Sequence, residues 1–296
     1  MPDWKGKTRG GVLGNLFFIY LIKYLGINSA YFFLRIVAVY FLIFSNKKYI
    51  YSFYRRILQF TPWKSIRFIY KNYCKLGEIL VDKFALLSGA KTRFSFNFDG
   101  EEHLRNMKNG GILISAHLGS WEIAGQLLER LDLAFNVVMF DAEHEKIKNH
   151  IDPMLTKKNF RIIVIKEDMS HIYEIRQALE RKELVCLHGD RFVENSKTVL
   201  KQFLGEEARF PAGPFYLVSR FEAPVSFVFA LKESSSHYHF FASRAKTYKF
   251  SKKYKDRDAN LNLVLEDYLI EFQEKVHLYP EQWFNYHKFW SEADDK

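Results

Sequence analysis

The sequence predicts an α/β fold with a mixed, mostly parallel central sheet flanked by helices and preceded by a hydrophobic helical region. From residue 94 onward, short apolar runs alternate with amphipathic stretches of helical period, which is the pattern of strands covered by helices. The chain before that point is apolar and helical in character. With 296 residues and 48% hydrophobic content, the chain is long enough to bury a sizeable core.

Residues 1–90 are predicted to form an N-terminal hydrophobic helical membrane anchor. Two apolar stretches, residues 12–25 and 30–44, are separated by a break at residues 26–29. Both fall short of the ~20 apolar residues that cross a bilayer. Basic residues interleaved with aromatic ones follow, as expected where a membrane-bound helix meets anionic headgroups. A signal peptide, or a hydrophobic cap on a soluble domain, would give a similar pattern.

A further helix is expected from Pro62 to about residue 88, with proline at its first position. Residues 91–296 are predicted to form the second unit, an α/β domain. Its expected strands are residues 94–98, 111–116, 135–140, 161–165, 184–187, 224–231 and 237–242. Its expected helices are residues 121–131, 170–181, 214–221 and 260–276. We expect residues 232–236 to join the last two strands as an antiparallel hairpin, and the basic residues 251–257 to form a solvated loop.

Composition limits the classes of partner. A net charge of +10 favours anionic partners such as nucleic acid, anionic lipid headgroups or an acidic carrier protein. No nucleic-acid-binding motif is present, and the apolar N-terminus argues against nucleic acid. Cys74 and Cys186 have neither disulfide-framework nor metal-ligand spacing, and Cys186 is expected to be a small buried apolar residue.

His117 and Glu122 follow the apolar run 111–116 and are the leading candidates for chemistry. Ligands of open parallel sheets collect at the carboxyl ends of the strands. On an unbroken helix, side chains five residues apart would point about 140° away from each other. The imidazole and the carboxylate can therefore meet only across a turn. Gly119 and Ser120 supply that turn, with Ser120 as the N-cap of the following helix.

The spacing alone is weak evidence, because a second His-x4-Glu pair occurs at His287 and Glu292. That pair follows a stretch rich in Trp and Tyr and has no buried strand before it. The context therefore favours His117.

Asp190 and Arg191 follow a second apolar run, residues 184–187, and are expected at the same sheet edge as His117. An arginine there can bind a phosphate or a carboxylate through two parallel N–H hydrogen bonds from its guanidinium group. A buried ion pair between Asp190 and Arg191 that closes a loop is the alternative.

Phe210, Pro211 and Gly213 lie at the start of a predicted helix with Pro214 in its first turn. Backbone N–H groups at a helix N-terminus attract anions, and Gly213 would let a ligand approach the backbone. An ordinary helix start without a ligand is the alternative.

The usual motifs of nucleophilic hydrolases, phosphate-binding loops, dinucleotide-binding folds and zinc peptidases are missing from the sequence. What remains is a histidine base, a carboxylate, an arginine and an anion-attracting backbone beside apolar surface. That set suits direct transfer between a lipid donor and a hydroxyl.

These residues together resemble the lysophospholipid acyltransferase superfamily, and within it the bacterial acyltransferases of the late, lauroyl or myristoyl type in lipid A biosynthesis. In glycerolipid members the first motif is Asn-His-x4-Asp, whereas here Ala116 and Glu122 replace the Asn and the Asp. This difference favours the lipid A branch. The resemblance covers nearly the whole chain and rests on the apolar N-terminus and on the segments 117–122, 189–191, 210–214, 223–224 and 280–283.

The resemblance implies that a fatty acyl group moves from a carrier thioester to a lipid hydroxyl at the inner face of the cytoplasmic membrane. The expected donor is acyl carrier protein in preference to coenzyme A, the expected acceptor is a lipid A precursor, and an anionic lipid surface is a further partner. No metal and no cofactor are needed. Asp190, Arg191, Phe210, Pro211 and Gly213 are the expected oxyanion-binding or substrate-binding residues.

The chemistry can be argued from the residues themselves. A hydroxyl is a poor nucleophile at neutral pH, so a base with a pKa near 7 should take its proton, and neutral imidazole at His117 fits that task. Glu122 would accept the other ring N–H and fix the tautomer. Arg191 or backbone N–H groups would stabilise the tetrahedral oxyanion, at about 3 kcal/mol per donor.

Three other functions stay open at this point. An enzyme acting on a glycerophospholipid or an aminolipid would use the same residues on a different acceptor. A basic peripheral membrane protein without enzymatic activity would contain His117 and Glu122 as structural residues. Nucleic-acid binding rests on charge and aromatic content alone.

Overall fold

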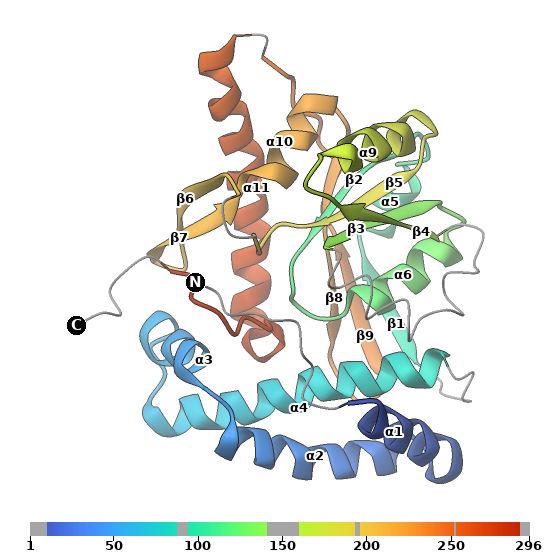
Figure 1. Ribbon diagram of the computed structural model, residues 1–296, viewed down its shortest axis with the longest axis vertical. Helices are drawn as coiled ribbons and strands as arrows, with labels where there is room; N and C mark the ends of the chain where they lie inside the picture. The colour runs from blue at the N-terminus through green and yellow to red at the C-terminus, as the bar shows by residue number, and fades with distance from the viewer. Residues whose placement is uncertain (1–10, 88–93, 141–159, 193–195, 252, 291–296) are drawn as a thin grey trace.

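The computed structural model describes residues 11–87, 94–140, 160–192, 196–251 and 253–290 (Figure 1). A seven-stranded sheet runs through its centre in the order β1-β9-β8-β2-β5-β3-β4. The strands are β1 (Ser95–Asp99), β2 (Gly111–Ser115), β3 (Phe135–Phe140), β4 (Phe160–Ile165), β5 (Leu184–His188), β8 (Val225–Lys232) and β9 (His237–Ala242). Neighbouring strands are parallel except for β8 and β9, which are antiparallel. The predicted mixed, mostly parallel sheet is confirmed, as is the late antiparallel hairpin.

Helices cover both faces of this sheet. The helices of the α/β part are α5 (Glu101–Arg105), α6 (Trp121–Arg130), α9 (Ser170–Glu180), α10 (Ala212–Phe221) and α11 (Tyr254–Leu278). Alternate residues of each strand point to opposite faces, so Ile112 of β2 joins the core cluster of α9, α10 and α11. Leu113 of the same strand joins the cluster that contains α5 and α6.

A second, two-stranded sheet lies beside α11 and was not predicted (Figure 1). It is the antiparallel hairpin of β6 (Thr198–Phe203) and β7 (Glu206–Pro211). Leu204 and Gly205 form its turn, both with positive φ, as two-residue hairpins require. The polar turn at Gly205 is visible in the sequence, but the flanking strands carry charged outward residues and no continuous apolar run.

One loop prediction is wrong. The basic residues 251–257 were expected to be a solvated loop, whereas α11 begins at Tyr254. Lysine, arginine and alanine are good helix formers, and the start of α11 contains Lys255, Arg257 and Ala259, so the helix begins before its apolar face does.

The N-terminal region consists of α1 (Gly11–Leu25), α2 (Ile27–Phe44), α3 (Lys48–Ser52), the π-helical turn η1 (Phe53–Ile57) and α4 (Pro62–Leu87). Only Gly26, with a φ of 80°, separates α1 from α2. Figure 1 shows α4 running across one end of the sheet, with α2 alongside it on the side away from the sheet. Residues of η1 and α4, such as Tyr54 and Ile69, share a core cluster with Ile112 of the sheet. The domain boundary at residue 90 stays a prediction.

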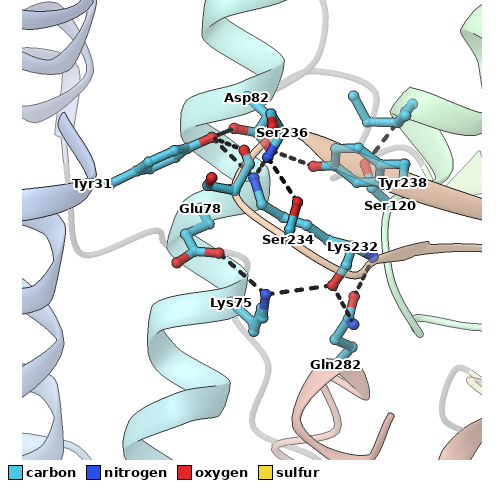
Figure 2. A network of polar contacts seen from close by, with 12 residues as sticks. Tyr31, Lys75, Glu78, Asp82, Ser120, Lys232, Ser234, Ser236, Tyr238 and Gln282 are labelled. Carbon is cyan, nitrogen blue, oxygen red and sulfur yellow. Dashed lines mark hydrogen bonds and ion pairs between the residues drawn. The ribbon is translucent and has the colours of Figure 1, made fainter. Parts of the chain in front are cut away.

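A buried polar cluster joins this region to the sheet (Figure 2). Lys232 at the end of β8 forms an ion pair with Asp82 of α4, and both side chains are fully buried. Tyr31 of α2 and Tyr238 of β9 donate hydrogen bonds to the same carboxylate. Burial raises the pKa of Asp82 and lowers the pKa of Lys232, while their mutual attraction opposes both changes. The cluster connects α2, α4 and the β8–β9 hairpin.

Candidate active site

The neighbouring parallel strands β2 and β5 bring two of the predicted site residues, His117 and Asp190, together. Ser115 at the end of β2 pairs in register with His188 at the end of β5. His117 and Asp190 each lie two residues further along the chain, so both emerge at the same edge of the sheet. The prediction that His117 and Asp190 share this edge is confirmed.

Asp190 binds His117 at two points. The Nδ1 atom of His117 lies 2.8 Å from Oδ1 of Asp190, and the backbone N–H of His117 donates to Oδ2 at 3.0 Å. The His117 side chain is 19% exposed, whereas Asp190 is 2% exposed. The imidazole can therefore be reached from outside, while its carboxylate partner is shielded from water.

The electrostatics of the pair favour a neutral imidazole and a charged carboxylate. Burial lowers the pKa of His117 well below its usual 6.5, and the nearby Arg191 cation lowers it further, although Asp190 opposes the change. Burial by itself would raise the pKa of Asp190, but attraction to His117 and Arg191 outweighs it and holds that pKa below the usual range. His117 is therefore uncharged at neutral pH and has one unprotonated ring nitrogen that can accept a proton, but burial and Arg191 hold its pKa below the value near 7 that was expected from the sequence.

The turn after His117 is built as predicted. Gly119 has a φ of 76°, and a Cβ there would collide with the carbonyl oxygen of Ala230. Ser120 is the N-cap of α6, where its hydroxyl accepts a hydrogen bond from the N–H of Ile123 at 3.4 Å. Its own N–H donates to the carbonyl of Ala230 at 2.8 Å. These contacts connect the turn to the adjacent β8.

The partner of the His117 ring at Nδ1 is Asp190, whereas Glu122 was expected to orient the imidazole. Glu122 is the second residue of α6, and its side chain lies outside the described part of the structure. A catalytic part for Glu122 stays a prediction. The role of orienting the ring through Nδ1 belongs to Asp190 in this structure, because adjacent parallel strands place it beside His117.

Arg191 lies beside this pair and donates from Nη2 to the carbonyl oxygen of Phe284 at 2.8 Å. Its charge lowers the pKa values of both His117 and Asp190. The guanidinium thus acts on the site electrostatically, and its binding to a substrate stays a prediction.

The other three candidates lie at the start of α10. Phe210 is fully buried and packs on Phe203 and Phe289, so it supports the fold from within the core. Pro211 is the N-cap of α10, and Gly213 is exposed with open space where a Cβ would lie. Contact of Pro211 or Gly213 with a substrate stays a prediction.

Two further histidines lie near the pair. The ring of His188 is 4.3 Å from the ring of His117, centroid to centroid. Burial lowers the pKa of His287 to about 4, with a smaller contribution from Arg191 that Asp190 opposes. His287, the histidine of the second His-x4-Glu pair, therefore lies close enough to Asp190 and Arg191 to interact with their charges. Its partner in that pair, Glu292, is outside the described residues.

A small apolar cavity of about 50 Å³ lies between α6 and the sheet, next to this site. His188 and Ser115 line it, and these residues end the two strands that carry Asp190 and His117. The remaining lining residues are mainly apolar: Leu113, Trp121, Ala124, Gly125, Leu128, Phe135, Val137, Val138, Cys186, Leu187 and Val228. A second cavity of about 30 Å³ shares Leu113, Ala124, Leu128 and Val228 with the first.

The thiol of Cys186 belongs to the lining of this cavity. Burial raises the pKa of Cys186 to about 12, so the thiol stays protonated at neutral pH. The prediction that Cys186 is a small apolar residue agrees with these mainly apolar surroundings.

Trp283 also lies at this site, although its position in the sequence predicted no role for it. The indole Nε1–H donates to Oδ2 of Asp190 at 3.2 Å. Trp283 follows the short 3-10 helix η2 (Pro280–Gln282), and Phe284 after it donates its N–H to the carbonyl of His117 at 2.9 Å. No local pattern could reveal a contact that spans 93 residues.

Comparisons with known proteins bear on this arrangement. Residues 13–292 match the family described as bacterial lipid A biosynthesis acyltransferases. A crystal structure of PlsC, the 1-acyl-sn-glycerophosphate acyltransferase of Thermotoga maritima, aligns with a TM-score of 0.43 and 11% identity over 90% of this chain and 95% of that chain. The search of curated proteins returned no match. Because the family match spans nearly the whole chain, the protein belongs to the bacterial lipid A biosynthesis acyltransferase family and is a lipid acyltransferase.

Proposed function

We propose that the protein transfers a fatty acyl chain from an acyl thioester, carried by acyl carrier protein, to a hydroxyl of a lipid A precursor. The observation that carries this proposal is the His117–Asp190 pair at the strand ends, beside an apolar cavity. A base oriented by a carboxylate is what acyl transfer to a hydroxyl needs. The family membership supports the acceptor class.

In the proposed reaction His117 is the general base. Asp190 accepts the Nδ1–H, so Nε2 has the lone pair that takes the proton of the acceptor hydroxyl. The hydroxyl oxygen attacks the thioester carbonyl carbon, and the tetrahedral intermediate collapses with loss of the C–S bond. The proton then passes from Nε2 to the departing thiolate, which yields an ester and a free thiol. Arg191 lies close enough to favour the negative charge of the intermediate.

The cavity beneath α6 would hold the acyl chain. Its lining is mainly apolar and suits a hydrocarbon chain, and at about 50 Å³ the cavity would have to widen as the chain enters. Because His188 and Ser115 lie at its catalytic end, a chain bound there would place its thioester carbon near His117.

The N-terminal helices would hold the enzyme on the membrane. α2 is the one helix among the described residues that is long and apolar enough to span a bilayer, yet only 22% of it is buried. Its exposed face and that of α1 carry Phe17, Tyr20, Tyr24, Leu25, Phe32, Phe33, Ile36, Val39, Tyr40, Ile43 and Phe44. An apolar surface of this extent on one side of a protein indicates a binding face.

We further propose that α2 lies in the plane of the membrane surface and does not cross it. Its buried stripe, Ala30, Tyr31, Leu34 and Ala38, is spaced for one helix face. A Cβ at Gly77 of α4 would collide with the side chain of Leu34, so the two helices are closely packed.

The first turns of α4 carry the aromatic and basic side chains expected of a helix that lies at the membrane surface. Trp63 in its first turn is 83% exposed, and the neighbouring Lys64 and Arg67 are also exposed. Aromatic and basic side chains beside an apolar helix are typical of binding to anionic headgroups from the cytoplasmic side. This arrangement supports an inner-membrane location.

The test is complementation of a null strain with lipid mass spectrometry. Wild-type protein should restore the lipid A species that carries one more acyl chain, and His117→Ala should not. His277→Ala is the matched control, because His277 is exposed on α11. Acylation of lipid A by His117→Ala would refute the proposed base.

The same experiment addresses the other acceptors. If the null strain loses an acylated phospholipid or aminolipid while its lipid A is unchanged, the acceptor proposed here is wrong. If purified protein consumes no acyl thioester with any of these acceptors, the catalytic role of the site is wrong.

A further inference from the structure

We propose that Trp283 is a positioning residue for acyl transfer, which fixes the carboxylate of Asp190 and through it the ring of His117. The proposal rests on the proposed function, because it assumes that His117 is the base. It is carried by the hydrogen bond from the indole Nε1 to Oδ2 of Asp190, at 3.2 Å.

Asp190 uses its two oxygens for different purposes. Oδ1 faces Nδ1 of His117 at 2.8 Å, whereas Oδ2 accepts from the backbone N–H of His117 and from the indole N–H of Trp283. A carboxylate held at one oxygen by two donors cannot rotate about its Cβ–Cγ bond without breaking both hydrogen bonds. Oδ1 is thereby kept directed at the imidazole. An indole N–H is a donor only, so it binds the charged carboxylate in one way.

The chain around Trp283 is paired with the catalytic turn on both sides. The carbonyl of Gln282 accepts from the N–H of Gly119 at 3.0 Å, and the N–H of Phe284 donates to the carbonyl of His117 at 2.9 Å. Leu118 and Trp283 form the antiparallel bridge between these two hydrogen bonds. The backbone therefore places the indole relative to His117 as well as to Asp190.

The indole itself is held rigidly. Trp283 is 1% exposed, and five aromatic rings meet it edge to face. These rings are Phe53 at 5.1 Å, Phe203 at 5.7 Å, Phe272 at 5.5 Å, Phe289 at 5.0 Å and Trp290 at 5.7 Å between centroids. Edge-to-face packing of this kind fixes the ring plane and hence the direction of its N–H.

Trp290 provides a matched control within the same aromatic cluster. It is also buried, and its Nε1 donates at 3.2 Å, but to the carbonyl of Phe203 in the β6–β7 hairpin. Trp283→Phe and Trp290→Phe each remove one indole ring and one N–H donor. Only the first removes a donor from the catalytic carboxylate.

The experiment measures acyl transfer from an acyl carrier protein thioester by both variants, with thermal unfolding in parallel. We expect Trp283→Phe to lower kcat by about 10- to 100-fold, the loss expected for a hydrogen bond to a charged group, with KM for the acceptor unchanged. Trp290→Phe keeps an aromatic ring against Trp283 and all donors to Asp190, so it should leave kcat within about twofold of wild type. Equal kcat losses in the two variants would overturn the proposal.

A double-mutant cycle with Asp190→Asn tests whether Trp283 acts through Asp190. In the Asp190→Asn background, Trp283→Phe should change kcat by less than about twofold. If the kcat losses of the two single variants multiply in the double variant, Trp283 acts independently of Asp190. That result would show a structural role for Trp283 and would also overturn the proposal. If Trp283→Phe does not fold, benzothienylalanine at position 283 replaces it, because that analogue keeps the bicyclic ring and lacks the N–H.

The outcome for His117→Ala separates this proposal from the proposed function. If His117→Ala transfers acyl chains normally, the base assignment itself fails. If His117→Ala is inactive while Trp283→Phe behaves like Trp290→Phe, only the role of Trp283 is wrong.

Discussion

Asp190 is almost fully buried at the site and has several hydrogen-bond donors around its carboxylate. Three N–H groups approach its carboxylate, from the ring and backbone of His117 and from Trp283. The negative charge is therefore compensated locally, and burial does not neutralise it. A charged Asp190 keeps His117 in the tautomer that leaves Nε2 ready to accept a proton.

We predict that His117 stays active at mildly acidic pH. Its pKa lies below 6.5 because of burial and Arg191, even though Asp190 opposes them, and His188 is the other titratable ring in contact. The folded protein thus binds no proton at His117 as the pH falls through 6.5, so kcat/KM should not decline there. A pH–rate profile checks this, and an acid limb at or above 6.5 would contradict it.

The same pKa difference affects stability. Between the lowered pKa of folded His117 and its usual 6.5, the unfolded chain binds more protons than the folded one. The contribution of His117 to the free energy of unfolding is therefore fully present above pH 6.5, and it is lost as the pH falls below that value.

At the scale of elements, α6 and the strands beneath it enclose the cavity. Gly125 lies in the middle of α6 and lines that cavity, where a Cβ would meet only Phe135, at an ordinary contact distance of 3.5 Å. The absence of a side chain at this position leaves space between the helix and the sheet.

We predict that Gly125→Leu shortens the acyl chain that the enzyme prefers. Leucine would fill the cavity, and its advantage over glycine in a helix, up to about 1 kcal/mol, would offset part of the cost of about 1–3 kcal/mol for overpacking. Rates with a series of acyl donors of different length provide the measurement. Unchanged kcat/KM for the longest donor would show that the chain lies elsewhere.

The exposed face of α2 is the second element with a testable role. We predict that Ile36→Asp weakens binding to vesicles of anionic lipid, because Ile36 lies on the apolar face with 58% of its surface exposed. Ile270→Asp on α11 is the matched control, since Ile270 is also exposed. Sedimentation with vesicles checks the prediction. Equal binding by both variants would place the membrane contact on another surface.

At the scale of the whole molecule, the Lys232–Asp82 pair joins the N-terminal helices to the sheet. The same lysine reaches the catalytic turn through its backbone. Gln282 accepts from the N–H of Lys232 at 2.8 Å and donates to its carbonyl at 2.9 Å, while its own carbonyl binds Gly119. The N-terminal helices, the sheet edge and the candidate active site are thus parts of one packed unit.

We predict that Lys232→Met lowers the free energy of unfolding by about 3–5 kcal/mol, because it leaves the buried carboxylate of Asp82 without its cation. Replacing both residues, with Lys232→Met and Asp82→Leu, should recover part of the loss. Lys201→Met breaks the more exposed pair with Glu266 and should cost no more than about 1 kcal/mol. Chemical denaturation gives all three values, and equal losses for the two lysine variants would contradict the prediction.

Local patterns in the sequence predicted most elements of the fold, because apolar runs and helical periods are local properties. The seven strands of the main sheet lie within a residue or two of their expected positions, and α6 begins at Trp121 after the predicted cap at Ser120. The β6–β7 hairpin was missed because its strands alternate charged and apolar residues over a short length. The sheet edge that carries His117, Asp190 and Arg191 also followed from the order of strands and loops.

By itself, the sequence determined the class of fold, the sheet edge at which chemistry would occur and the histidine to expect there. Only the tertiary structure decided which groups surround that histidine. Asp190 lies 73 residues from His117, and Trp283 lies 93 residues from Asp190. Contacts of this kind depend on strand order and on the path of the C-terminal segment, which the packing of the whole core sets.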